Sequence, residues 1–255
     1  MAEIAGNRMQ LSSRPQPAYL VEYQEIEPQK PESFESIQSD REKSLKFGHQ
    51  FCGAHNIAGA NCPNCQKPLL RFLTLDTTDE RIGLSQLGER RIHCLFCWTC
   101  NIAHEPFYYK HHDDGSIALI EYGKDGVEVD FPYEDYPSAF PEASVTLLEI
   151  ASDAQKAIQS VNAGRLKISS WRDKHPDLFG CQHQIGGEPF LIQRNPNYAT
   201  ERDIRCPECK KSTPFFVSIA DDCLDERGFT ENDGVQVIFN LCRQCLTMCA
   251  FQQCD

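Results

Sequence analysis

The sequence lacks any long apolar run. No segment reaches the roughly 18 apolar residues that a membrane-spanning helix needs, and the first twenty residues lack the basic start and apolar core of an export signal. We therefore expect a soluble protein that is not exported, located in the cytoplasm. Hydrophobic residues make up 40% of the 255 residues, which is enough to build real cores.

Catalytic signatures are missing as well. The sequence contains no Gly-x-Ser-x-Gly elbow, no His-Glu-x-x-His helix, no phosphate loop, and no His-x-Glu motif paired with Pro-Cys-x-x-Cys as in zinc deaminases. Nothing in the pattern supplies a nucleophile together with a base. We therefore predict that the protein is not an enzyme.

Positive charge is scarce. Lys and Arg number 25 against 37 Asp and Glu, so the formal net charge is −12. Binding to nucleic-acid phosphates needs clustered basic residues, and here they are dispersed apart from small groups at 90–91 and 202–211. A basic protein client is the expected partner. A nucleic-acid-binding or RNA-processing role stays open as the alternative, because zinc ribbons often serve there.

Cysteine, by contrast, is abundant, with fourteen residues in the chain. Eight of them form four Cys-x-x-Cys pairs, a spacing at which one tight turn directs two thiolates at one metal ion and two turns complete a tetrahedron. The predicted ligands, paired within each half of the chain, are Cys62, Cys65, Cys97 and Cys100, then Cys206, Cys209, Cys242 and Cys245. Four protein ligands leave no open coordination position, so we predict two structural Zn²⁺ ions.

Other interpretations of these pairs are less consistent with the sequence. A thioredoxin-like pair begins a helix within a βαβ unit, and disulfide scaffolds are usually short secreted chains; neither pattern is present. Metal pairing across the halves stays possible on spacing alone. The other six cysteines are expected as buried thiols: Cys52, Cys94, Cys181, Cys223, Cys249 and Cys254.

The cysteine pairs belong to a longer internal repeat. His55–Ala60 precedes the first pair and His183–Glu188 precedes the third, and an apolar run follows each. The predicted fold is α+β but mainly β, with duplicated β-rich halves that each carry a zinc-ribbon-like site of four cysteines, joined by an amphipathic helix. The predicted divisions are 1–46 (an N-terminal arm with short elements), 47–140 (first half), 141–164 (linking helix) and 165–255 (second half).

Local patterns predict the individual elements. Alternation and β-branched residues indicate strands at 18–27, 69–75, 91–96 and 235–239. Residues 76–90 are expected to form an exposed loop. Apolar residues from Val145 to Val161 recur at helical spacing and predict the linking helix. His55 and His183 occupy matching places and are expected to be ordinary turn histidines, with a hydrogen bond to a metal-bound thiolate as the alternative. His104, His111 and His112 are expected on a solvated loop.

Residues 107–140 mix aromatic rings with acidic side chains. Such a segment can form a face that binds a basic peptide. The alternative, which we favour, is a hairpin of 117–122 with 127–131, with its rings in the core and its acids in solvent.

The second half also carries a family resemblance. His183–Pro189 with Gln193, the Asp233-Gly234 turn before an apolar strand, and Phe251–Cys254 together resemble the YwqG-like bacterial proteins, which are similar to the eukaryotic programmed-cell-death-two group. The resemblance covers 181–255 best and, through the repeat, 47–109. It implies a duplicated β-rich fold without catalytic residues, and a chaperone-like or toxin-immunity role. Many relatives have few cysteines, so this chain departs from the family in its complete Cys-x-x-Cys pairs.

Overall fold

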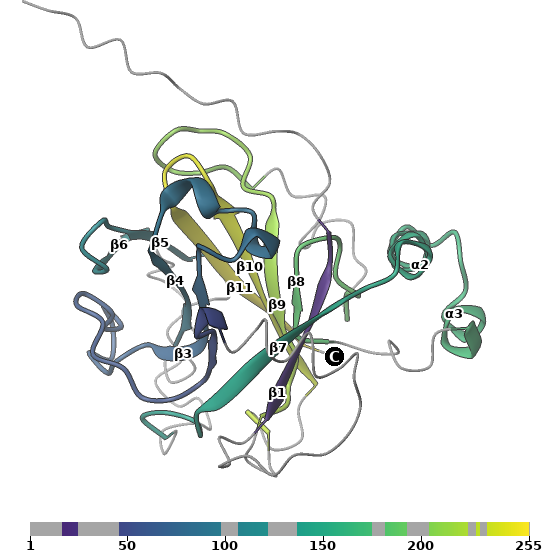
Figure 1. Cartoon of the computed structure of the whole chain (residues 1–255), viewed down its shortest axis with the longest axis horizontal. Helices are drawn as coiled ribbons and strands as arrows, with labels where there is room; N and C mark the ends of the chain where they lie inside the picture. The colour runs from purple at the N-terminus through teal and green to yellow at the C-terminus, as the bar shows by residue number, and fades with distance from the viewer. Residues whose placement is uncertain are drawn as a thin grey trace, which may run out of the picture.

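One curled antiparallel sheet organises the molecule. In the computed structural model, the residues described are 17–24, 46–97, 107–121, 137–174, 182–192, 204–223, 228–229 and 234–254. They form an 11-stranded sheet in the order β4-β3-β2-β7-β1-β8-β9-β10-β11-β5-β6, with two helices beside it (Figure 1). The mainly β character predicted from the sequence is confirmed.

The strands follow one another along the chain with few helical interruptions. Their bounds are β1 Tyr19–Gln24, β2 Gln50–Phe51, β3 Leu70–Asp76, β4 Arg91–Phe96, β5 Phe107–His111, β6 Ile117–Glu121, β7 Ala143–Glu149, β8 Gln184–Ile185, β9 Phe215–Ile219, β10 Val235–Cys242 and β11 Thr247–Cys254. Helices α2 (Ser152–Asn162) and α3 (Ile168–Lys174) follow β7, and two short 3₁₀ turns, Glu80–Ile82 and Ser85–Leu87, lie between β3 and β4. The four strands expected at 18–27, 69–75, 91–96 and 235–239 are therefore present.

The centre of the sheet corrects the prediction of a continuous linking helix over 141–164. Residues Ala143–Glu149 form β7, and the helix begins only at Ser152. Ala143, Val145 and Leu147 are buried at every second position, the period of a strand, and β7 pairs with β1 along its length. The helical spacing of Val145 and Leu148 was a coincidence, because the backbone there follows sheet pairing, whereas Ala154, Ile158 and Val161 are the buried positions of helix α2, as predicted.

Two strand triplets flank the central pair of strands, β7 and β1, and each triplet contains a Cys-Pro-x-Cys turn. In the first triplet β2 pairs with β3 and β3 with β4; in the second β8 pairs with β9 and β9 with β10. Strand β7 pairs with β2, while β1 pairs with β8. The N-terminal strand therefore lies beside the C-terminal triplet, and one sheet runs through both predicted halves.

Strand β5 lies beside β4, the strand at the opposite end of the sheet order (Figure 1), and its side chains hydrogen-bond the β4 backbone. The Tyr109 hydroxyl accepts a hydrogen bond from Leu95 N at 2.8 Å and donates one to His93 O at 2.9 Å. The imidazole of His111 accepts from His93 N at 3.0 Å. His111 is buried in β5, so the expectation that it lies on a solvated loop is wrong.

A large shared core lies inside the curl. Its fully buried rings include Phe51, Phe72, Phe96, Phe107 and Phe239. The segment over 76–90 was expected to be exposed, yet Ile82 and Leu84 are completely buried in this core. Here two apolar side chains in an otherwise polar stretch turn the loop inward, because burial of each contributes about 1.5–3 kcal/mol.

The aromatic and acidic segment is described only in part. Phe107, Tyr109 and Phe140 are buried in the core, as the favoured interpretation requires for these three rings. β6 pairs with β5, and the predicted partner strand at 127–131 lies outside the described residues. The part of the chain that the structure describes contains no helix long and apolar enough to cross a membrane.

Candidate metal centres

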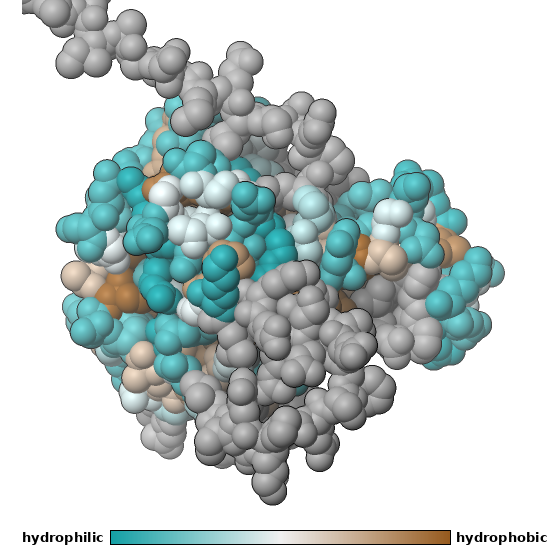
Figure 2. All heavy atoms as spheres, viewed as in Figure 1, coloured by the Kyte–Doolittle hydropathy of each residue, from teal (hydrophilic) through white to brown (hydrophobic). Residues whose placement is uncertain are grey.

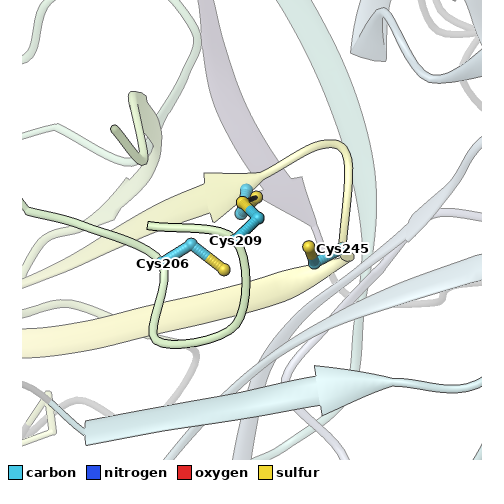
Figure 3. A group of neighbouring side chains, drawn as sticks. Cys206, Cys209 and Cys245 are labelled. Atoms are coloured by element: carbon cyan, nitrogen blue, oxygen red, sulfur yellow. Dashed lines mark hydrogen bonds between the residues drawn. The ribbon is translucent and has the colours of Figure 1, made fainter. Parts of the chain in front are cut away.

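The second pair of cysteine turns brings four thiols together. Sγ atoms of Cys206, Cys209, Cys242 and Cys245 all lie within 4.8 Å of one another. Figure 3 shows Cys206 and Cys209 on the loop that precedes β9 and Cys245 at the turn between β10 and β11, with their sulfurs directed toward one another. The turn between β10 and β11 thus faces the Cys-Pro-x-Cys loop.

The first pair of turns builds a similar group. Sγ atoms of Cys62, Cys65 and Cys97 also lie within 4.8 Å of one another. The predicted fourth member, Cys100, lies outside the described residues. Both groups form within a predicted half, as expected from the sequence, and no described cysteine group combines turns from different halves.

Sulfur spacing tests whether a metal ion fits. A tetrahedron with Zn–S bonds of about 2.3 Å places its sulfurs about 3.8 Å apart. The Sγ–Sγ distance is 3.8 Å between Cys65 and Cys97 and 3.6 Å between Cys209 and Cys242. Both are far longer than a disulfide bond of about 2.05 Å. The donors therefore fit a tetrahedral thiolate site.

The backbone around each turn explains how the sulfurs converge. Cys62 N donates to Lys67 O at 2.8 Å, and Gln66 N donates to Cys62 O at 3.0 Å. In the other half, Cys206 N donates to Lys211 O at 2.8 Å, and Lys210 N to Cys206 O at 2.9 Å.

The residue after the second cysteine is left-handed in every described turn. The φ angles are 61° at Gln66, 60° at Lys210 and 55° at Leu246. Such angles are uncommon for residues other than glycine. Strained backbone of this kind persists where the surrounding structure fixes it, often at a ligand site.

The second centre contacts parts of the first half. Glu208, inside the Cys206 turn, accepts from Lys110 Nζ of β5 at 2.9 Å and from Thr247 Oγ1 at 3.3 Å. Arg243, inside the Cys242 turn, donates to Gly83 O at 2.7 Å. These contacts bind the cysteine turns of one predicted half to the strand and loop of the other.

Metal binding by these cysteines should depend on pH, because each thiol must lose its proton to become a ligand. Burial raises the pKa of the Cys242 thiol to about 11, and a metal ligand must be a thiolate. Binding of a cation here displaces thiol protons, so affinity falls as the pH is lowered.

The two histidines singled out from the sequence have hydrogen-bond partners other than the cysteine sulfurs. His55 lies 2.6 Å from Leu69 O through Nε2, and its Nδ1 accepts from Ile57 N. His183 Nδ1 accepts from Ala220 N at 3.0 Å, and Nε2 lies 2.9 Å from the Asp222 carboxylate. Both are hydrogen-bonded turn histidines, as expected.

His183 matches His49 and not His55. His49 Nδ1 accepts from Asp76 N at 3.1 Å, and its Nε2 lies 2.9 Å from the Asp79 carboxylate, which is the arrangement that His183 has with Ala220 and Asp222. Sequence reasoning missed this match. The signal that would have found it is a repeated His-Gln-apolar-x-Gly pattern at 49–53 and 183–187.

Comparison with known proteins adds no assignment to this geometry. Searches against protein-family models, curated proteins and solved structures found no match for the chain.

Proposed function

We propose that the protein is a zinc-stabilised binding module that captures a basic protein client. The proposal that the protein binds zinc rests on the group of four sulfurs from Cys206, Cys209, Cys242 and Cys245. An all-thiolate set selects zinc among the common divalent ions, and four protein donors leave no position for a substrate. The ions are therefore structural, and Cys100 completes the first site.

The proposal includes a tandem duplication of a zinc-ribbon-like unit. It is supported by the matched hydrogen bonds of the two Cys-Pro-x-Cys turns and by the matched pairs His49–Asp79 and His183–Asp222. The resemblance to the YwqG-like family belongs to the same proposal. Thiolate ligands must stay reduced, which favours the cytoplasm as the compartment.

Charge and surface character support a basic client. The chain carries a formal net charge of −12. Over the described residues, the face in Figure 2 is mostly hydrophilic, and Ile120 is the large hydrophobic side chain that they leave exposed. An apolar docking patch is therefore not offered by this part of the chain. Electrostatic attraction is the recognition that the composition favours.

An affinity purification tests the proposal. The tagged full-length chain is recovered from its native host at low salt, divided, and washed with moderate salt or treated with nuclease. We expect one basic protein that salt releases and nuclease leaves in place, because screening weakens contacts between exposed charges. Recovery of nuclease-sensitive RNA, or of partners that only detergent removes, would contradict the proposed client.

A further inference from the structure

The outer faces of the two strand triplets differ, although their backbones correspond. Gln50, Thr74 and His93 are neighbours across β2, β3 and β4. Their counterparts across β8, β9 and β10 are Gln184, Ser218 and Ile238. By the same register Arg91 corresponds to Gln236, and Arg71 corresponds to Phe215.

In the second triplet this face is a filled apolar core. Ile238, Cys249 and Phe251 are buried together under Leu191 and Ile204, with Phe215 packed against them. Gln236 holds the covering segment in place, because its amide donates to Phe190 O at 2.8 Å and accepts from Ile192 N at 3.3 Å.

In the first triplet the same face is an open polar pocket of about 630 Å³. Its floor is formed by Gln50, Arg71, Thr74, Arg91 and His93 from the three strands, and its walls by residues 54–58 and 114–116. A β-bulge next to Arg71 places that side chain on the floor. The walls are fixed to each other, since Ile117 N donates to Ala58 O at 2.9 Å.

Arg71 is held rigidly at the base of the pocket. Its guanidinium is almost fully buried and donates to Cys52 O at 2.7 Å, to Gln50 Oε1 at 3.2 Å and to Glu142 Oε2 at 2.8 Å. Glu142 balances its charge. Three of the five guanidinium N–H groups are used in these bonds, so two remain.

Arg91 supplies a cation that is not balanced in this way. It is exposed and donates to Gly48 O at 3.0 Å. Within the described residues no carboxylate forms an ion pair with it. A guanidinium on the floor of a partly enclosed pocket is well suited to a planar or tetrahedral anion.

His93 adds a neutral donor. It is 7% exposed, and burial lowers its pKa to about 3, so its ring is uncharged at neutral pH. Nδ1 lies 2.9 Å from Thr74 Oγ1, and Nε2 has no hydrogen-bond partner among the described residues. When the Thr74 hydroxyl donates to Nδ1, Nε2 carries the proton and can donate into the pocket.

Asp114, at the wall of the pocket, limits how much negative charge a ligand can carry. Asp114 accepts hydrogen bonds from Ser116 N and Oγ at 2.9 and 2.6 Å, so its negative charge is fixed beside the pocket. A polyphosphate would be repelled there, whereas one acidic group reaching Arg91 would not meet the same accumulated charge.

We propose that this pocket binds a small anionic molecule through one carboxylate or phosphate group, with Arg91 and His93 as its recognition residues. The site is separate from both cysteine groups, none of whose members lines the pocket. In the described part of the second triplet, apolar side chains fill the corresponding face.

A titration observed by NMR tests the proposal on the full-length, zinc-loaded chain. Acetate and inorganic phosphate serve as probes at constant ionic strength, and the imidazole signals of His93 and the backbone signals of 54–58 are followed. We expect saturable shifts with at least one probe. A response to acetate alone indicates a carboxylate ligand, and a response to phosphate alone indicates a phosphate ligand.

Two arginine variants provide the contrast. Arg91→Gln should weaken binding by about tenfold or more, because a charge-assisted bond is lost. Arg90→Gln is the matched control, since Arg90 pairs with Asp113 and does not line the pocket, and it should bind as the unmodified chain does. Absence of saturable shifts with both probes, or equal binding by Arg91→Gln, would overturn the proposal.

Discussion

The triplets β2-β3-β4 and β8-β9-β10 share a backbone and differ at two places. The outer face is a polar pocket in the first and an apolar core in the second. The edge also differs, because β10 pairs with β11 through a backbone ladder, whereas the outer edge of β4 is bonded by side chains of β5. The comparison teaches that two triplets with matching cysteine turns and matching strand pairing can carry different side chains on the same face.

The largest effect should come from removing a cysteine ligand. Cys206→Ser should lose one metal ion and unfold the second triplet, because structural zinc contributes about 10–16 kcal/mol of apparent binding energy to folding in small domains. Metal content and a melting curve measure this. Cys94→Ala is the control, since Cys94 is buried outside both groups. A Cys206→Ser chain with unchanged metal content and melting would show that these thiols do not hold the fold.

The next effect concerns the edge of β4. Tyr109→Phe removes the hydroxyl that bonds Leu95 N and His93 O, and leaves two buried backbone groups unsatisfied. We expect a loss of about 2–4 kcal/mol in the free energy of unfolding, measured by denaturant titration. Tyr19→Phe is the control, because the Tyr19 hydroxyl has no hydrogen bond with the described residues. Equal stability of the two variants would mean that β5 does not close the sheet.

Lowering the pH should destabilise the fold through protonation of His111, which lies at the same edge. Burial lowers its pKa to about 4, below the usual value of about 6.5. The unfolded chain therefore binds the proton first, and stability falls as the pH drops from about 6.5 toward 4, by roughly 3 kcal/mol in total. His111→Gln should flatten this part of the stability profile. An NMR titration of the folded chain that places the His111 midpoint near 6.5 would contradict the arrangement.

A smaller difference in stability is expected between variants of the two matched pairs, His49–Asp79 and His183–Asp222. The Asp79 side chain is 2% exposed and also bonds Arg81, whereas that of Asp222 is 59% exposed. Burial raises the pKa of the Asp79 carboxyl, but hydrogen bonds from His49 and Arg81 outweigh burial and hold that pKa well below its usual range. Asp79→Asn should cost about 2 kcal/mol, and Asp222→Asn below about 1 kcal/mol. Equal losses in urea unfolding would contradict the role of burial.

Sequence patterns predicted what depends on local chemistry. Cysteine spacing grouped the metal turns, and alternation found β3, β4 and β10. Features set by strand pairing were missed. Val145, Leu148 and Ala151 recur at helical spacing and so predicted a helix, whereas Ala143–Glu149 pairs with β1 and buries alternate side chains. The pocket was also missed, since the bulge next to Arg71 and the strand register decide which side chains share a face.

The match of His49 with His183 was available in the sequence. It was overlooked because His55 lies nearer the first cysteine pair and resembles His183 in its local context. Cys100 and most of the acidic segment lie outside the described residues, so their predicted roles stay predictions.

Metal stoichiometry tests the central claim most directly. Native mass spectrometry of the full-length chain, combined with elemental analysis, counts the ions and identifies them. The account predicts two zinc ions per chain and loss of cooperative unfolding when a chelator removes them. A chain that carries no zinc, or that keeps its fold and melting temperature after complete zinc removal, would contradict it.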